Sequence, residues 1–489
     1  GNHDISALTL LEIIDNKNET LEGSRINFVT NTIDQLFAGG DEGQYVSGFA
    51  SEFGRVSYVG RLNYSYADKY LLQATTRYDA SPKFSPENRW GIFPSLSLGW
   101  RLSKENFLKE SSVIENLKLR ASISKSGYDN IGNFQYLSGF ELTDGVIFGG
   151  SSVPGLSSTG IANPNLFWEK LTTYNVGLNF GLFSNKLYGE FDIFNRKRIG
   201  ILGTRIASLP NTFGGALPVE NLNEQTAKGY EIVLGTQGKI KDFSYKFEGN
   251  FSRTRTKWDK FDEPEYSDSD EIRIKKKTGN WANRLFGWKT DGLFTSQEEI
   301  DNYPLDQDNL GNSTIRPGDI KYVDVSGPDG IPDGTLDWRD QVQIGRSVVP
   351  EIYFGFNSSI KYKNFDMDFL LQGAANATIR VSPAIYVNQA FGPQIVYNNR
   401  WSEDNNDPNA RFPRRSFRRA NNVKISDFWT VDGSYLRLKA LSIGYTLPNN
   451  DIFQSLRISV SGTNLFTISE ASKFGVDPEV TPDGGAGFY

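Results

Sequence analysis

Two neighbouring stretches decide the fold: residues 56–66, VSYVGRLNYSY, and residues 70–79, YLLQATTRYD. In each of them, apolar or aromatic residues recur at every second position, and polar residues such as Arg61, Asn63 and Arg77 stand between them. Because side chains on a strand alternate between two faces, each stretch predicts a β-strand with one apolar face and one polar face. Asp68 and Lys69 interrupt the pattern, which predicts a tight turn between two antiparallel strands.

The strands predicted by this alternation have the composition of a barrel wall. Their polar faces carry charges, and tyrosines stand near the ends of their apolar faces. In a membrane barrel the apolar side faces lipid, the polar side faces a wet lumen, and aromatic residues mark both interfaces. The alternation continues along the chain and predicts roughly fifteen strands, with weaker signals near residues 24–34 and 284–296.

The connections between the predicted strands alternate in length. Short ones, such as residues 183–185 and 363–364, follow long ones, such as residues 128–167 and 374–430. Outer-membrane barrels have this asymmetry, with short turns on one rim and long loops on the other. We therefore predict an all-β fold, an antiparallel transmembrane β-barrel of which this chain forms only a part, because about fifteen strands leave both edges of a large barrel bare.

The composition narrows the function classes. The chain has 489 residues, no Cys, one Met, one His and a formal net charge of −6. Without Cys, thiol nucleophiles and Cys-ligated zinc are excluded, and with His3 as the only histidine, a Ser-His-Asp triad is nearly excluded. An acidic chain also argues against a nucleic-acid partner. No apolar run reaches the 18 or so residues of a transmembrane helix, whereas a barrel strand needs only about 10 residues.

A family resemblance supports the same fold. Residues 78–102, YDASPKFSPENRWGIFPSLSLGWRL, resemble the signature hairpin of the SusC/RagA family of TonB-linked outer-membrane transporters of Bacteroidetes. Further segments resemble that family in the same order; they are residues 290–294 (TDGLF), 318–324 (GDIKYVD), 433–439 (GSYLRLK) and 475–479 (GVDPE). The resemblance implies that residues 1–489 are the C-terminal part of the receptor barrel. The plug, the N-terminal extension with its TonB box, and the final strand would lie outside this chain.

What the resemblance implies for function is active import across the outer membrane of a Gram-negative bacterium, without enzymatic chemistry. The imported substrates would be oligosaccharides or peptides, and the energy would come through the TonB complex. A SusD-like surface lipoprotein would cover the barrel, with residues 128–167 and 374–430 as its contacts, and lipid would surround the wall. Two alternatives are a passive porin with an open lumen and a soluble carbohydrate-binding β-protein with its apolar faces turned inward.

Four tryptophans are the candidates for substrate contact. They lie in or beside the long loops: Trp168, Trp338, Trp401 and Trp429. Aromatic rings at binding sites stack on sugar rings or on peptide side chains. The more ordinary role for any one of them is loop packing or an interface girdle.

An acidic loop, residues 324–337 (DVSGPDGIPDGTLD), is the candidate metal site. Its carboxylates are Asp324, Asp329, Asp333 and Asp337. Ca²⁺ takes six to eight oxygen ligands from loops that glycine allows to turn sharply, so Ca²⁺ is the one cofactor to consider. The spacing departs from the Asp-x-Asn-x-Asp-Gly-like loop of the family, and the alternative is a polar turn in which Asp and Gly serve turn geometry.

A basic cluster in the last long loop has two interpretations. It consists of Arg411, Arg414, Arg415, Arg418 and Arg419. One interpretation is nucleic-acid binding, which the acidic net charge of the chain argues against. The better interpretation is that these arginines pair with nearby carboxylates (Glu403, Asp404 and Asp407) or contact lipid phosphates or a partner protein.

Overall fold

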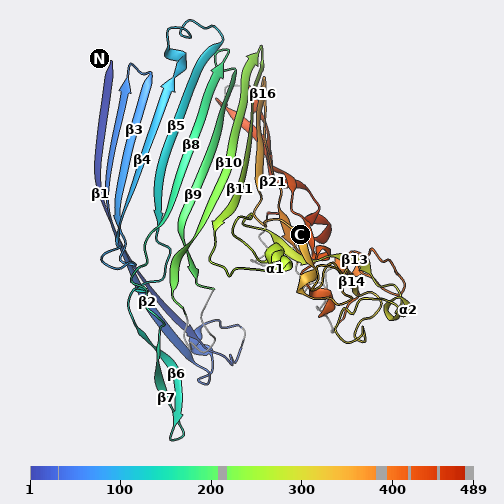
Figure 1. The fold of residues 1–489 in the computed structure, drawn as a ribbon. Helices are drawn as coiled ribbons and strands as arrows, with labels where there is room; N and C mark the ends of the chain where they lie inside the picture. Colours follow the sequence, from blue (N-terminus) through green and yellow to red (C-terminus); the bar gives the residue numbers. More distant parts are fainter. Residues whose placement is uncertain are drawn as a thin grey trace. The chain divides into compact units, whose positions relative to one another are not determined.

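The structure is a computed structural model that describes residues 2–30, 32–206, 217–381, 394–416, 420–448 and 452–479. Its main feature is an antiparallel sheet of 13 strands, hydrogen-bonded in the order β1-β2-β3-β4-β5-β8-β9-β10-β11-β16-β17-β20-β21 (Figure 1). The strands are β1 (His3–Ser24), β2 (Tyr45–Tyr66), β3 (Tyr70–Ala80), β4 (Trp90–Arg101), β5 (Ile114–Tyr128), β8 (Glu169–Leu182), β9 (Leu187–Thr204), β10 (Val219–Ile240), β11 (Phe243–Lys260), β16 (Ile352–Tyr362), β17 (Phe365–Ala375), β20 (Tyr435–Leu447) and β21 (Leu456–Ser469). The all-β prediction is confirmed.

Shorter strands pair with one another inside the loops. These two-stranded sheets join β6 (Phe140–Phe148) to β7 (Ser151–Ser158), β12 (Leu285–Trp288) to β15 (Gln341–Gly345), β13 (Thr290–Leu293) to β14 (Ile320–Tyr322), and β18 (Thr378–Arg380) to β19 (Thr430–Asp432). The weak strand signal at residues 284–296 was therefore correct about strands and wrong about the sheet they join. At residues 24–34 the described part of the chain has no strand beyond the end of β1 at Ser24.

The described helices are all short. They are α1 (Ser269–Ile274), α2 (Gln297–Asp301), α4 (Gln394–Asn399) and the 3-10 turns at Leu36–Ala38, Leu102–Lys104, Trp338–Asp340, Asn421–Val423, Asp427–Trp429 and Ala471–Phe474. Among the described residues, no helix is long and apolar enough to cross a membrane.

The chain divides into two compact units, of which the first comprises residues 1–98, 122–173 and 198–222. In this unit the predicted hairpin is present: β2 pairs with β3 from Tyr66 opposite Tyr70 to Val56 opposite Ala80. Ala67 and Asp68 both have positive φ, at 52° and 54°, as the tightest hairpin turns require. On the other side, β2 pairs with β1 without a break over 22 residues.

The second unit comprises residues 99–121, 174–197 and 223–489. In it β10, β11, β16, β17, β20 and β21 pair in succession, each antiparallel to the one before. Short turns around Lys241 and Lys363 join strands at one end, while residues 261–351 and 376–434 form long connections at the other end (Figure 1). The predicted asymmetry of turns and loops is confirmed for these strands.

The two faces of the sheet in the second unit differ as the barrel prediction requires. One face presents apolar side chains that no described residue covers fully: Leu234 is 51% exposed and Val176 is 55% exposed. On the opposite face Arg120 donates to Asp192 at 2.5 Å and to Asn179 at 2.8 Å, so one cation joins three strands. An apolar face without a protein cover and a polar face with ion pairs are the two sides of a membrane barrel wall. A soluble sheet would have buried the first face.

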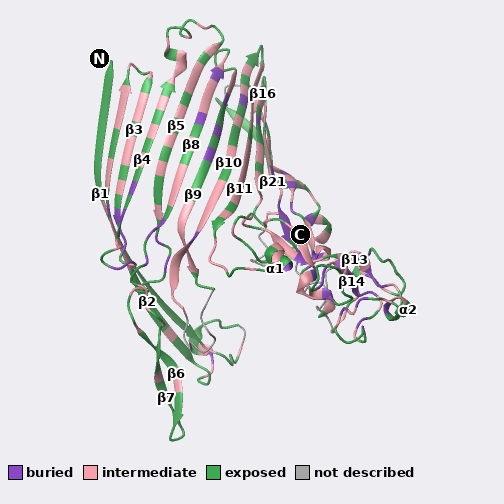
Figure 2. Ribbon diagram, viewed as in Figure 1, coloured by how far each residue is buried: buried purple, intermediate pink, exposed green. Residues whose placement is uncertain are grey.

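The largest buried cluster of the second unit lies in its loops and not on the sheet (Figure 2). It contains Leu293, Leu305, Ile320, Tyr322, Leu336, Val381, Val396, Trp401, Ala410, Phe412 and Trp429. These residues come from both long connections, residues 261–351 and 376–434, and we call the cluster the loop core. Sheet strands that separate lipid from lumen bury little against protein, so the loops hold the core.

Candidate functional site

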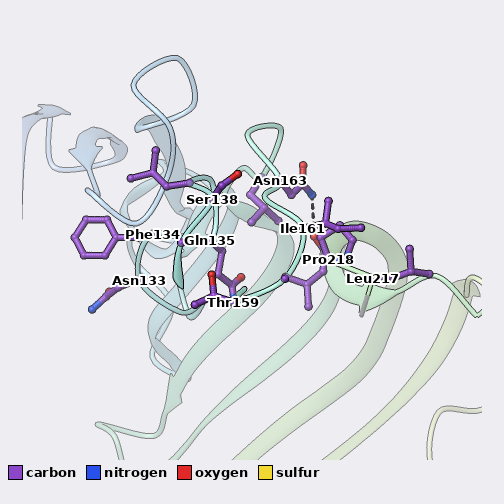
Figure 3. Close-up of a pocket in the computed structure, with 14 residues that line it drawn as sticks. Asn133, Phe134, Gln135, Ser138, Thr159, Ile161, Asn163, Leu217 and Pro218 are labelled. Carbon is purple, nitrogen blue, oxygen red and sulfur yellow. Dashed lines mark hydrogen bonds between the residues drawn. The ribbon is translucent and has the colours of Figure 1, made fainter. Parts of the chain in front are cut away.

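The candidate site is a pocket of about 550 Å³ within the first unit, on the loop after β5 and the start of β10 (Figure 3). Its lining is Asn133, Phe134, Gln135, Leu137, Ser138, Gly139, Thr159, Gly160, Ile161, Asn163, Leu166, Leu217, Pro218 and Val219. This loop falls within residues 128–167, one of the two long loops that the family resemblance implies as contacts of the lipoprotein.

An ion pair fixes the point where the loop leaves the sheet. The carboxylate of Asp129, directly after β5, accepts two hydrogen bonds from the guanidinium of Arg55, at 2.8 Å and 2.9 Å. Lys83 donates to the backbone carbonyl of the same aspartate at 3.3 Å. Both partners of Asp129 are partly buried, and charge-assisted bonds of this kind are the stronger class of hydrogen bond. The loop therefore starts from a fixed position.

Two asparagines join the pocket loop and the segments next to it. The Asn163 side chain donates to the carbonyl of Val219 at 2.8 Å (Figure 3), and its backbone N–H donates to the carbonyl of Gln135 at 2.9 Å. Asn221 donates to the carbonyls of Phe167 and Gly200 at 2.9 Å and 2.7 Å. Amide side chains can thus hold three chain segments together without introducing a charge.

A small hydrophobic core adjoins the pocket through Leu166. Phe84, Phe93, Ile131, Leu166 and Trp168 are its buried members, and Leu166 also lines the pocket. Trp168 is only 3% exposed, and its indole N–H donates to the carbonyl of Arg89 at 3.1 Å. Its ring centroid lies 5.3 Å from those of both Phe84 and Phe93. Trp168 therefore supports the site, and a direct contact with substrate stays an untested prediction.

The chemistry of the pocket is neutral. None of the described residues that line it carries a charge; its polar groups are amides and hydroxyls, and the rest are apolar. Such a surface can exchange hydrogen bonds with hydroxyls or amides of a ligand while Phe134, Ile161 and Leu217 contact its apolar parts. It gives no strong preference to an anion or a cation.

Phe134 has a strained backbone at the edge of this pocket. Its φ is +59°, in the left-handed region, and its side chain is 61% exposed. An L-residue other than Gly, Asn or Asp in that region costs roughly 1–2 kcal/mol. Strain of this kind at an exposed aromatic residue is a reason to consider a role in binding.

The other three candidate tryptophans lie in the second unit. Trp429 and Trp401 belong to the loop core, at 2% and 7% exposure, and their indole N–H groups donate to Asn422 and Asn406. Trp338 is half-buried between cations, with Lys275 at 4.4 Å and Arg339 at 4.6 Å from its ring centre. The rings of Trp401 and Trp429 are packed in the loop core, and that of Trp338 is held in cation–π contacts. Substrate contact by these three residues likewise stays an untested prediction.

The acidic loop uses its carboxylates on its own backbone. Asp324 accepts from the N–H of Gly334 at 2.6 Å, Asp333 from that of Thr335 at 2.9 Å, and Asp337 caps the turn at Arg339 at 2.7 Å. Asp329 lies at an exposed turn. In the part of the chain that the structure describes, no three acidic or histidine side chains are grouped as a metal site. The polar-turn interpretation accounts for these contacts, and Ca²⁺ binding by this loop stays an untested prediction.

Sequence reasoning missed Asp340, the most buried carboxylate of this region. It accepts backbone hydrogen bonds from Val325 at 2.8 Å and Asp337 at 2.8 Å. Burial raises the pKa of Asp340 above its usual range, and the side chain of Asp324 beside it acts in the same direction. A count of acidic residues cannot identify this one, because its burial depends on how the loops pack.

The basic cluster is resolved for Arg411, Arg414 and Arg415, whereas Arg418 and Arg419 lie outside the described residues. Arg414 pairs with Asp319, at 2.6 Å and 3.1 Å, and not with Glu403, Asp404 or Asp407 as predicted from proximity in sequence. Asp319 also accepts from Asn422 at 2.8 Å. Asp319 therefore joins the two long connections of the second unit.

The pocket residues were also missed individually, although their loop was identified. Amides and hydroxyls in loops are common, so their types alone carry no signal. Asn163 is the most informative of them, because its side chain and its backbone N–H each hold a neighbouring segment, at Val219 and at Gln135.

Comparisons with known proteins agree with this architecture. The family model described as TonB dependent receptor-like, beta-barrel matches residues 18–465. The chain belongs to the TonB-dependent receptor β-barrel family. The predicted resemblance to SusC and RagA is confirmed, and with it the location in the outer membrane of a Gram-negative bacterium.

Individual relatives of this receptor chain place it more closely. It is 31% identical over 499 residues to TonB-dependent receptor P3 of Formosa agariphila, covering 98% of this chain and 47% of the relative. It is 28% identical over 440 residues to TonB-dependent receptor SusC of Bacteroides thetaiotaomicron, covering 87% of this chain and 41% of the relative. The solved structure of the RagAB peptide transporter superposes with a TM-score of 0.75 at 20% identity, over 99% of this chain and 51% of that one. This receptor chain thus spans about half the length of these relatives.

Proposed function

We propose that the protein to which this chain belongs imports nutrient molecules across the outer membrane. The observation that carries the proposal is the family match over residues 18–465 on a sheet whose outward face is apolar. The imported molecules are oligosaccharides or peptides, and the transport step is driven through TonB and not by diffusion. The protein binds and moves its substrate and makes no covalent change to it.

The neutral pocket supports this class of substrate. Hydroxyls of a sugar and amides of a peptide backbone are both neutral hydrogen-bonding groups, and Asn133, Gln135 and Thr159 offer donors and acceptors for either. The absence of charge among the described lining residues favours ligands that are recognised by shape and hydrogen bonding. RagAB, whose solved structure has the same fold, is a peptide transporter, which is in keeping with the peptide alternative.

A partner lipoprotein forms the second part of the proposal. The β6–β7 hairpin follows directly from the pocket loop and exposes seven large apolar side chains: Phe140, Leu142, Val146, Ile147, Phe148, Val153 and Leu156. Exposed apolar residues gathered on one hairpin are typical of a surface that another protein covers. A SusD-like lipoprotein resting on this hairpin would sit beside the pocket and could share the substrate with it.

Uptake by cells tests the transport proposal. Cells that lack the receptor are expected to lose uptake of the defined oligosaccharides or peptides on which the parent strain depends, and dissipating the proton gradient is expected to abolish uptake in the parent. Uptake that persists without the gradient, together with solute flux through liposomes that contain the receptor, would instead identify a passive porin.

Co-purification tests the partner proposal. Replacing Phe140 and Leu142 with serine is expected to release the lipoprotein, whereas replacing Ser151 and Ser157 of the same hairpin with alanine is expected to retain it. If both variants keep the lipoprotein, the hairpin is not its docking surface.

A further inference from the structure

The apolar outward face of β10 and β11 ends in a group of cations. Side chains that share this face include Tyr230 and Phe251, whose rings stack at 5.9 Å, and Tyr245 and Phe247, whose rings stack at 5.5 Å. In chain order, the outward positions of β11 are Phe243, Tyr245, Phe247, Gly249, Phe251, Arg253, Arg255, Lys257 and Asp259. The change from apolar to basic therefore occurs within one step along the strand.

The length of the apolar part matches a membrane. The nine residues from Phe243 to Phe251 rise ~3.3 Å each along a strand tilted by ~40°, which corresponds to about 23 Å across the bilayer. The apolar band of outer-membrane barrels is ~25 Å tall. β11 begins at a short turn and ends at a long loop (Figure 1). An apolar band of this height would put Arg253, which follows it, at the level of the lipid head groups on the long-loop side.

The cations form one cluster across two strands. Lys228 lies directly opposite Arg255, and its diagonal neighbours are Arg253 and Lys257. Side chains directly opposite in a sheet have Cβ atoms about 5 Å apart, and diagonal ones are ~7–8 Å apart. These cations line a groove of about 1160 Å³ together with Tyr174, Val176, Ile193, Tyr230 and Trp281.

Most of this charge is not neutralised by the protein. Arg255 pairs with Glu351 at 3.0 Å and lies 3.7 Å from the centre of the Trp281 ring. No ion pair of the described residues includes Lys228, Arg253 or Lys257. Asp259, at the edge of the groove, accepts a hydrogen bond from Thr226 at 2.5 Å. Like charges placed opposite each other destabilise a sheet, so an anion in this groove would stabilise the pair formed by Lys228 and Arg255.

We propose that this groove binds the phosphate group of a membrane lipid in the leaflet on the long-loop side. Lys228, Arg253 and Lys257 hold the phosphate, and the aromatic residues Tyr174, Tyr230 and Trp281 lie at the same interfacial level. The acyl chains lie on the apolar face that continues below, at Val176, Ile193 and Phe251. Continuity with the lipid-facing band favours a lipid over a protein partner, and the site is independent of which nutrient is imported.

Lipid binding to the purified, delipidated receptor tests the proposal. Native mass spectrometry measures its affinity for phosphatidic acid, for phosphatidylcholine with the same acyl chains, and for inorganic phosphate. The test variant carries Lys228→Gln, Arg253→Gln and Lys257→Gln. The matched control carries Lys239→Gln, Lys241→Gln and Lys361→Gln, which remove three cations near the short turns. Heat-modifiable electrophoretic migration identifies the folded protein, and Lys228→Gln alone replaces the triple variant if the latter does not fold.

The expected result is that phosphatidic acid binds the parent and control proteins more tightly than phosphatidylcholine does, and that the test variant loses roughly tenfold or more of its affinity for phosphatidic acid. Equal affinity of the test and control variants would overturn the proposal. Inorganic phosphate binding as tightly as phosphatidic acid would overturn it as well, because the groove would then be a site for a free anion.

Discussion

Leu234→Arg should destabilise the inserted barrel because it places a charge in the lipid. Leu234 lies on the outward face of β10, opposite Gly249 of β11 and near the middle of the apolar band defined by Phe243 and Phe251. An arginine on the lipid face of a barrel costs ~2–4 kcal/mol near the bilayer midplane. Since 1.4 kcal/mol is a factor of 10, the folded population relative to the unfolded one should fall by about 30- to 700-fold.

The matched control is Asn250→Arg, because Asn250 stands one position along β11 and faces the polar side, opposite Val233. Urea titration of the receptor refolded into lipid vesicles, followed by heat-modifiable migration, gives the free energy of unfolding of each variant. Leu234→Arg is expected to lower it by ~2–4 kcal/mol and Asn250→Arg by less than about 1 kcal/mol. Equal losses would refute the assignment of the two faces, and so would a larger loss in the control.

Three further predictions concern the loops. Trp168→Ala is expected to cost ~3–5 kcal/mol in urea unfolding because the ring is fully packed, while Trp338→Ala, whose ring is half-buried, should cost clearly less; similar losses would contradict the packing role of Trp168. Phe134→Asn should relieve the strain of the left-handed backbone by up to ~1 kcal/mol, and because this stabilises the folded loop, amide exchange at residues 129–139 should become slower. Uptake should weaken in this variant if the Phe134 ring contacts substrate. Faster amide exchange would contradict the strain argument. Burial lowers the pKa of Lys424 from 10.5 to about 8. Between pH 8 and pH 10.5 the folded loops therefore bind fewer protons than the unfolded chain, because Lys424 is neutral only in the folded state. The stability of the loops should rise with pH across this range by up to about 3 kcal/mol. Hydrogen exchange at β13 and β14 measures this rise, and Lys424→Met should remove it; an unchanged slope in that variant would assign the effect to another group.

The strands could be predicted because their pattern is local. Alternation at residues 56–66 and 70–79 depends only on the two faces of a strand, and the hairpin turn at Ala67 and Asp68 follows from the break between them. The same local pattern does not set where a strand ends in a loop. β1 continues to Ser24, beyond its apolar part, because β2 offers it backbone partners as far as Tyr45.

The site could not be predicted because it depends on contacts between distant residues. The neutral pocket requires Asn163 to reach Val219, 56 positions away. Trp168 belongs to a core because Phe84, from the loop between β3 and β4, and Phe93, from β4, pack against it. Arg414 likewise forms its ion pair with Asp319, 95 positions away, and not with the carboxylates that are close to it in sequence. Composition and the spacing of residues in the sequence do not indicate which distant residues will be in contact.

The contacts of Asp319 have a consequence for motion. Its side chain binds Arg414 and Asn422, and Asn422 in turn accepts from the N–H of Ile320 at 2.9 Å, so two loops about a hundred residues apart are joined through buried polar groups. Opening either loop alone would leave a buried carboxylate without its cation, which costs several kcal/mol. The segment around Asp319 should therefore move together with the segments around Arg414 and Asn422, so that a displacement of one long connection at these positions is transmitted to the other.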